Sequence, residues 1–472
     1  MTHYSKLTLA AAAVAATMAG TSSTAVAQSA DALIDKLVDK GVLTVNEAKD
    51  LRAEADKDFT AAYSAKTGMP EWETALKFNG DVRGRFETFN FDNPLAADRQ
   101  RFRYRMRFGV TANIVDDLEA GFRLTSSEAA SGGVNGGDPI SANTTMQDNG
   151  SKKLVFIDLA YARWAPIHTP DWSGAFTLGK MENPFVFSDM VFDSDYTPEG
   201  LGMQFGYNFN SKHSAKFSAG AFLMDEIGAS NKDPYFAGAQ LRLESKWSKQ
   251  VQTSFGVAAL GIANDESLNA SRGGGFGGAG GTNIVGTTTW TVPNSNTGNS
   301  RSGLAGTSGT GGSLLNNFNP IVVDGSITCS LEKFWHYNAA FPIKLAADYM
   351  NNPAADTQNN AWSVGVTFGK SGKRGLWDLG YRYKHLEGDA WFEEITDSDF
   401  GAFYQVASAR TGGSTGNLNG TNVKGHILRA SYSPFDSLTL GITAFLTEAI
   451  EQSPAGSESG MTRVQMDAVL KF

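Results

Sequence analysis

The stretch RFRYRMRF, residues 101–108, decides the fold of this chain. Arginines and apolar residues alternate in it without exception, with a period of two. Successive side chains of a β-strand point to opposite faces, so a strand here has one arginine face and one apolar face. A helix would instead space its apolar residues three or four positions apart. The stretch therefore predicts a strand that separates an apolar environment from a polar one.

The same alternation recurs from residue 76 to the end of the chain. It is clear in 76–87, 118–125, 201–208, 377–384 and 463–472. It is less regular in 154–164, 175–181, 214–224, 235–245, 250–260, 341–350, 361–369, 422–433 and 437–447, and weakest in 321–333. Together with 101–108, these segments predict about 16 strands.

The connections between these segments are alternately short and long. Short ones lie at 116–117, 208–212, 247–249, 370–374 and 433–437, and long ones at 126–153, 182–199, 261–320 and 387–421. Long loops therefore gather at one end of the sheet and short turns at the other, which is the layout of an outer-membrane barrel. A soluble β-sandwich would alternate in the same way. The aromatic residues near strand ends and the alternating strand that ends the chain at Phe472 favour the barrel.

We therefore predict an all-β fold, a transmembrane antiparallel β-barrel of about 16 strands over residues 71–472. A mean hydropathy of -0.25 excludes a helical membrane protein, but it is expected where lipid-facing and water-facing residues alternate. The net charge of -9, with no basic block, argues against a nucleic-acid-binding protein. A single cysteine excludes a disulfide scaffold and a multi-cysteine zinc site.

The N-terminal residues predict two further segments. Residues 1–27 resemble a secretory signal peptide, with Lys6 before an apolar run at 7–20 and small residues at 25–27. Residues 28–70 predict a periplasmic helical segment, in which 44–47 form a capping box. An even number of strands places both barrel ends on the short-turn side, which suits this segment. The helical segment either packs on its own chain or acts as an oligomerisation or tether element.

A barrel of 16 strands is too wide for its own side chains to fill, so we expect an aqueous lumen. The polar faces of the first two strands carry a ladder of Arg83, Arg85, Arg101, Arg103, Arg105 and Arg107. The connection 182–199 is aromatic and acidic, and it carries Asp189, Asp193, Asp195 and Glu199. If that loop folds inward, the two groups form a constriction with a transverse field. Alternatively, the arginines pair with Asp81, Glu87 and Glu119, and the acids belong to a calcium-binding or surface loop.

The remaining motifs predict no catalytic chemistry, cofactor or metal site. A GxSxG match at 412–416 and a GxGxxG match at 273–278 both lie in low-complexity loops, without the strand and helix that such motifs need. The six histidines show no metal-ligand spacing. We therefore expect a protein that is not an enzyme.

Three stretches resemble the "putative porin" family of Gram-negative outer-membrane proteins. They are ALIDKLVDKGVLTVNEAKDLRAE (32–54), GKMENPFVFSDMVFDSDYTPEG (179–200) and ITDSDFGAF (395–403) with the strands that follow it. The resemblance implies a 16-stranded channel, assembled as a trimer. It implies no particular substrate.

The leading hypothesis is a passive diffusion channel of the outer membrane for small hydrophilic solutes and ions, with an anion preference from the arginine ladder. Its expected partners are outer-membrane lipid, lipopolysaccharide and two further copies of itself. Two alternatives remain open. One is a substrate-selective channel, and the other is a structural anchor that contacts the cell wall through residues 29–66.

Overall fold

A computed structural model describes residues 76–115, 117–128, 136–226, 231–268, 298–301, 314–404, 416–452 and 456–472. The predicted signal peptide (1–27) and periplasmic helices (28–70) lie outside these residues, and so do the two motif matches at 273–278 and 412–416, the latter except for its last residue. Residues 1–75 form a separate unit from the rest of the chain, which is described here by itself.

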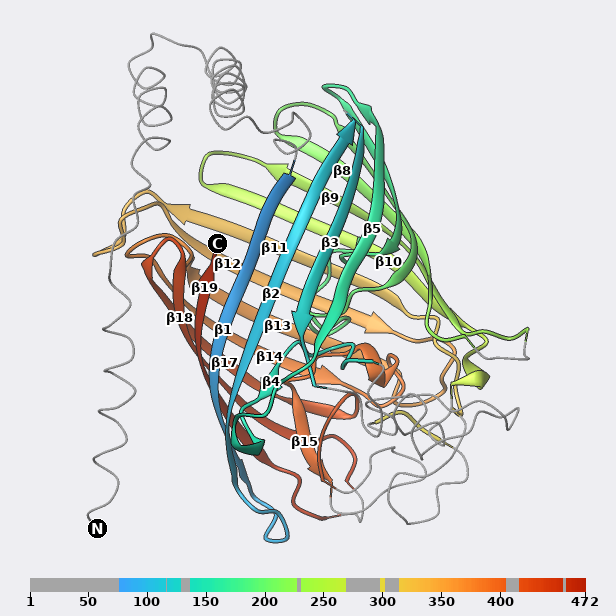
Figure 1. Cartoon of the computed structure of the whole chain (residues 1–472), viewed down its shortest axis with the longest axis vertical. Coiled ribbons are helices and arrows are strands. Elements are labelled where there is room, and N and C mark those ends of the chain that lie inside the picture. The colour runs from blue at the N-terminus through green and yellow to red at the C-terminus, as the bar shows by residue number, and fades with distance from the viewer. Residues whose placement is uncertain are drawn as a thin grey trace. The chain divides into compact units, whose positions relative to one another are not determined.

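Sixteen antiparallel strands form one closed sheet (Figure 1). They are β1 (Leu76–Phe91), β2 (Arg99–Val115), β3 (Leu118–Ser126), β5 (Val155–His168), β6 (Trp172–Lys180), β7 (Glu199–Asn208), β8 (His213–Leu223), β9 (Tyr235–Lys246), β10 (Val251–Ala263), β11 (Ile321–Leu331), β12 (Phe341–Asn351), β13 (Asn360–Gly369), β14 (Trp377–Leu386), β17 (Val423–Phe435), β18 (Leu438–Ala449) and β19 (Met461–Lys471). Each strand predicted from the sequence has a counterpart in this set, including the weak segment 321–333. The prediction of a 16-stranded all-β barrel is confirmed.

The barrel closes where β1 pairs with β19, the blue and red strands that lie side by side in Figure 1. Gly80 and Phe472 exchange two backbone hydrogen bonds of 2.9 and 3.1 Å at this seam. The short β4 (Thr144–Thr145) pairs with β2, and β15 (Gly401–Tyr404) with β16 (Gly416–Asn419) forms a separate hairpin. Three short 3-10 turns complete the described elements: η2 (Asp148–Gly150), η3 (Asp265–Ser267) and η5 (Glu393–Ile395). Over this part of the chain, no helix has the length and apolar character to cross a membrane.

Most connections between neighbouring strands alternate in length as the sequence predicts; the exception is 332–340, which has nine residues and is longer than 92–98 and 352–359. Both ends of the barrel sheet lie on the side of the short connections, which are 116–117, 169–171, 209–212, 247–250, 332–340, 370–376 and 436–437. The other side carries 92–98, 127–154, 181–198, 224–234, 264–320, 352–359, 387–422 and 450–460. This asymmetry is typical of an outer-membrane barrel.

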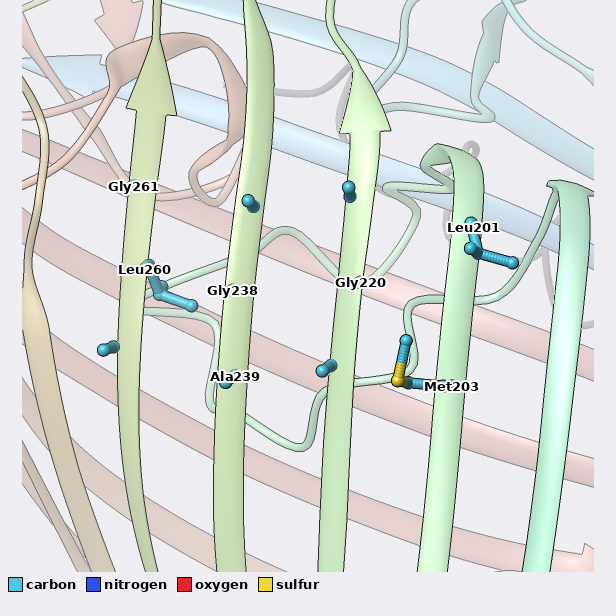
Figure 2. Close-up of a pocket in the computed structure, with 11 residues that line it drawn as sticks. Leu201, Met203, Gly220, Gly238, Ala239, Leu260 and Gly261 are labelled. Atoms are coloured by element: carbon cyan, nitrogen blue, oxygen red, sulfur yellow. The ribbon is translucent and has the colours of Figure 1, made fainter.

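The outer face of the barrel is apolar and exposed. Phe102 and Met106 of β2 and Leu178 of β6 all point outward, with 38–65% of their surface exposed. Exposed aromatic residues gather at the short-turn ends of the strands, as in an interfacial girdle: Trp164, Trp172, Trp247, Phe435 and Phe472. Figure 2 shows a depression in this face over β7–β10, lined by Leu201 and Met203 of β7 and by small residues of the neighbouring strands, such as Ala239 and Gly261.

The inner side of the barrel contains a hydrophobic core. Trp391 and Phe192, both from inward-folded loops, pack against Phe236 of β9 at ring distances of 5.9 and 5.4 Å. Inward residues of β8–β14 also belong to this cluster. The sequence analysis expected an aqueous lumen because strand side chains cannot fill so wide a barrel. Apolar side chains of the loops, packed against inward strand residues, fill part of it.

Candidate pore constriction

Arginines line the inner face of β1, β2 and β19. The six predicted arginines all lie on this arginine wall, and Arg463 of β19 joins them there. The register of β1 and β2 places Arg83 opposite Arg105 and Arg85 opposite Arg103. Like charges directly across a strand pair are destabilising, so this arrangement requires counter-ions.

Two carboxylates within the wall supply part of that charge. Asp81 accepts hydrogen bonds from Arg105 at 2.8 Å and from Arg107 at 2.6 Å. The other is Glu87, which is fully buried and contacts Arg101 at 2.9 Å and Arg463 at 2.6 Å. These contacts agree with the alternative hypothesis that the arginines pair with Asp81 and Glu87. Glu119, the third partner considered, instead accepts a hydrogen bond from Tyr161.

The loop between β6 and β7, residues 181–198, folds into the barrel and reaches the arginine wall. Asp195 lies 3.1 Å from Arg105 and 3.4 Å from Arg107. Gln240 holds the loop nearer its start. Its side-chain amide exchanges hydrogen bonds of 2.9 and 2.8 Å with the backbone of Val186. Charged and polar side chains at both ends thus fix its position in the lumen.

The four predicted loop acids have different surroundings. Only Asp195 contacts the arginine wall. Asp189 pairs with Arg382 of β14 at 2.7 Å. The Asp193 carboxylate accepts backbone hydrogen bonds and contacts no arginine of the described segments, and Glu199 forms an exposed pair with Lys180 at 3.0 Å. The sequence prediction placed all four in one negative group, whereas the fold distributes them. No group of three or more His, Cys, Asp or Glu side chains in the described ranges is arranged to hold a metal ion.

A second acidic turn, which the sequence analysis did not select, lies beside the first. Asp397-Ser398-Asp399 repeats the sequence of Asp193-Ser194-Asp195, and an aromatic residue follows each. In both turns the first aspartate accepts a hydrogen bond from the backbone N–H of the second, at 2.7 and 2.9 Å. In both, the second aspartate contacts the arginine wall. Asp399 reaches Arg85 at 3.0 Å and Arg463 at 2.8 Å. The repeated Asp-Ser-Asp-aromatic pattern is the signal that could have identified this turn.

The two turns are hydrogen-bonded to each other, and their surroundings shift the pKa values of their carboxyl groups. Ser398 donates its backbone N–H to Asp193 at 2.7 Å, and Asp193 donates its own to Ile395 at 3.0 Å. Burial raises the pKa of Asp193 well above its usual value, and Asp195 and Asp397 add to the effect. Burial also opposes ionisation of Asp399, but Arg463 and Arg85 outweigh it and lower the pKa of that carboxyl. Asp399 therefore faces the wall as a carboxylate.

A third loop contributes a short segment, residues 298–301. Asn299 and Arg301 are fully buried. Arg301 pairs with the equally buried Glu393, and the backbone N–H of Asn299 donates to the same carboxylate at 2.7 Å. This segment fastens the connection between β10 and β11 to the segment that carries Trp391. The segment thus links the connection between β10 and β11 to the one between β14 and β17.

These contacts define a channel-type barrel with a charged wall and inward-folded loops. The family model described as "Putative porin" matches residues 91–300 and 315–472. The chain belongs to this family. It is a porin-like channel. The resemblance noted from three short sequence stretches is thereby confirmed, and the match includes two of those stretches.

Several solved porin structures resemble this porin at low identity. The high-pH structure of OprB from Pseudomonas putida has 10% identity and a TM-score of 0.48, and the match covers 84% of this chain and 94% of that one. OmpF of Salmonella typhi, in complex with daunomycin, has 10% identity, a TM-score of 0.43 and coverages of 84% and 97%. OmpT of Vibrio cholerae, in its trimer form, has 10% identity, a TM-score of 0.40 and coverages of 84% and 99%. No protein of curated function matches the chain.

Proposed function

We propose that this porin is a passive diffusion channel for small hydrophilic solutes and ions, with a preference for anions. One observation carries the proposal. Seven arginines stand on the arginine wall, and six carboxylates lie within 4.0 Å of them: Asp81, Glu87, Glu128, Asp195, Asp399 and Asp467. The described part of the wall thus keeps one positive charge in excess. Charges at the narrowest part of a pore determine which ions pass.

Purified full-length protein in a planar bilayer tests the proposal. Reversal potentials in a KCl gradient should show that chloride passes more readily than potassium. The double variant Arg103→Ala/Arg105→Ala removes two positive charges and leaves Asp81 with Arg107 alone, so its preference should move toward potassium. Lys424→Ala, on the outer face beside Glu448, serves as the control. Unchanged selectivity in the double variant would contradict the assignment of the arginine wall as the selective element.

A substrate-selective channel is the second candidate, and the filled part of the barrel favours it. The aromatic cluster around Trp391 and the two Asp-Ser-Asp turns narrow the lumen more than strand count alone requires. Single-channel recordings with added solutes distinguish the two. Current that stays linear and unblocked indicates a general pore, and block by one solute indicates selectivity.

We further propose a homotrimer whose outer apolar face contacts outer-membrane lipid and lipopolysaccharide. The family resemblance is the ground for the trimer, and the exposed apolar girdle is the ground for the lipid contact. Chemical crosslinking in the membrane followed by mass determination should yield three protomers.

The tether alternative rests on residues 29–66, which lie outside the described residues. Deletion of 29–66 that detaches the envelope but preserves conductance would support the tether.

A further inference from the structure

Four arginines at the centre of the arginine wall form a compact block. They are Arg83 and Arg85 on β1 and Arg105 and Arg103 opposite them on β2. All four side chains lie on the same inner face, so each guanidinium has another beside it along the strand and across it. Cations packed this closely need an anion near each of them, because a largely buried unpaired charge is costly.

Three members of this arginine block have carboxylate partners. Arg85 contacts Asp467 and Asp399 at 2.7 and 3.0 Å. Asp81 and Asp195 neutralise Arg105 at 2.8 and 3.1 Å. Arg103 is less well matched, because its two carboxylates, Glu87 and Glu128, both stand 3.6 Å away, beyond hydrogen-bond distance.

Arg83 has no carboxylate within 4.0 Å among the residues that the structure describes. Its register neighbours are Arg105 on one side and Val469 on the other, so neither adjacent strand offers an acid at its level. Within the described ranges, its one side-chain hydrogen bond is to Asn143, whose Oδ1 accepts from Arg83 Nη2 at 2.6 Å. Arg83 is also the one member of the arginine block that is not fully buried, so water in the lumen can reach it.

Asn143 joins the two under-compensated arginines. Its backbone oxygen accepts a hydrogen bond from Arg103 at 3.2 Å, while its side-chain oxygen serves Arg83. Both acceptors are neutral. The Nε atoms of Arg83 and Arg103 are buried and have no hydrogen-bond acceptor among the described residues. The loop position is firm, since β4, which follows Asn143 directly, pairs with Arg103 and Tyr104 of β2.

We propose that Arg83, Arg103 and Asn143 form a binding site for a small oxyanion, a carboxylate or a phosphate, that permeates the channel. Two guanidinium groups provide the charge and the donors that planar carboxylates and phosphates bind best. A neutral asparagine stands where an aspartate would have completed the ion pairs and closed the site. The site rests on the proposed channel function and names its substrate class and its selective residues. Its occupant supplies the negative charge that the wall lacks.

Single-channel recordings in KCl with added inorganic phosphate or acetate test the site. Either probe should reduce the chloride current of the wild type in a saturable way, and comparison of the two shows which oxyanion binds better. Asn143→Asp keeps the shape of the side chain but adds a fixed carboxylate between the two arginines. A fixed like charge a few ångströms from the bound anion should weaken its affinity by at least about tenfold. Arg83→Gln should lose the block as well.

The control is Arg429→Gln. Arg429 lines the lumen on β17 with 59% of its side chain exposed, and its loss changes the lumen charge by the same single unit as Asn143→Asp. Block that persists in this control and disappears in both site variants supports the site. An equal reduction in all three variants would overturn it, because the effect would then be one of overall lumen charge. Absence of block in a conducting wild type would also overturn it.

A binding measurement separates this proposal from the channel proposal. Isothermal titration of the detergent-solubilised full chain with inorganic phosphate and with acetate reports the site without any current. Binding that Asn143→Asp abolishes, in a protein that does not conduct, would preserve the site and refute the channel function. Conductance without binding of either probe would refute the site and preserve the channel function.

Discussion

Asp399 is the residue whose replacement should most clearly release the second Asp-Ser-Asp turn from the arginine wall. Its carboxylate accepts hydrogen bonds from Arg85 at 3.0 Å and from Arg463 at 2.8 Å. Asn in its place keeps the shape but loses the charge, and its amide donors face two guanidinium groups. Charge-assisted hydrogen bonds contribute about 1.5–3 kcal/mol each, and breaking a buried pair costs about 3–5 kcal/mol. The released conformation should therefore become roughly 100- to 4,000-fold more populated, at about 1.4 kcal/mol per tenfold.

Single-channel current noise at constant voltage measures this release. Asp399→Asn should show added transitions between conductance levels, because the released turn moves in and out of the path. Glu199→Gln makes the same change of charge in an exposed pair with Lys180, and such pairs contribute only about 0–1 kcal/mol. If Asp399→Asn is as quiet as Glu199→Gln, the turn does not depend on the wall for its position, and the reasoning fails.

Three further predictions concern pH, the core and the seam. Burial raises the pKa of Asp138 to about 6, so neutralisation of this loop carboxyl near Arg103 should strengthen anion preference as the pH falls from 7 to 5, and Asp138→Asn should reduce that pH dependence of the reversal potential. Because the folded-state pKa is raised, the stability from this group is present below about pH 4 and is lost as the pH rises through 6. Trp391→Ala should cost about 3–5 kcal/mol and lower the midpoint of thermal unfolding followed by circular dichroism, whereas exposed Trp335→Ala should not. Gly80→Val should reduce the folded, heat-modifiable fraction on gels, because a Cβ there would meet a backbone oxygen at 2.5 Å, while Gly84→Val on the same strand has open space.

Local patterns in the sequence were sufficient for the barrel itself. Alternation in 101–108 and its repeats depends only on the two faces of a strand, and even the weak segment 321–333 became β11. Loop lengths alternate because hairpins on one side of a barrel can be short. The inward face of the six arginines followed from the same period of two.

The arrangement of the constriction depended on contacts between residues far apart in the chain. Asp193 and Ser398 are separated by 205 positions, and nothing in either stretch states that the turns meet. The four acids are close together in the chain, but in the fold three of them pair with cations of different strands, whereas Asp193 accepts hydrogen bonds from loop backbone. In the sequence, Asp397 and Asp399 were noted only within the stretch 395–403 that resembles the porin family.

The sequence by itself determined a closed barrel with one apolar and one charged face, because side-chain alternation is a property of each strand alone. Tertiary structure decided where the charges are neutralised, because ion pairing requires atoms within 4 Å and the chain brings them together only after the loops fold inward. Arg83 illustrates the difference. In sequence it is one of six equivalent arginines, and in the folded barrel it is the one of those six without a carboxylate among the described residues.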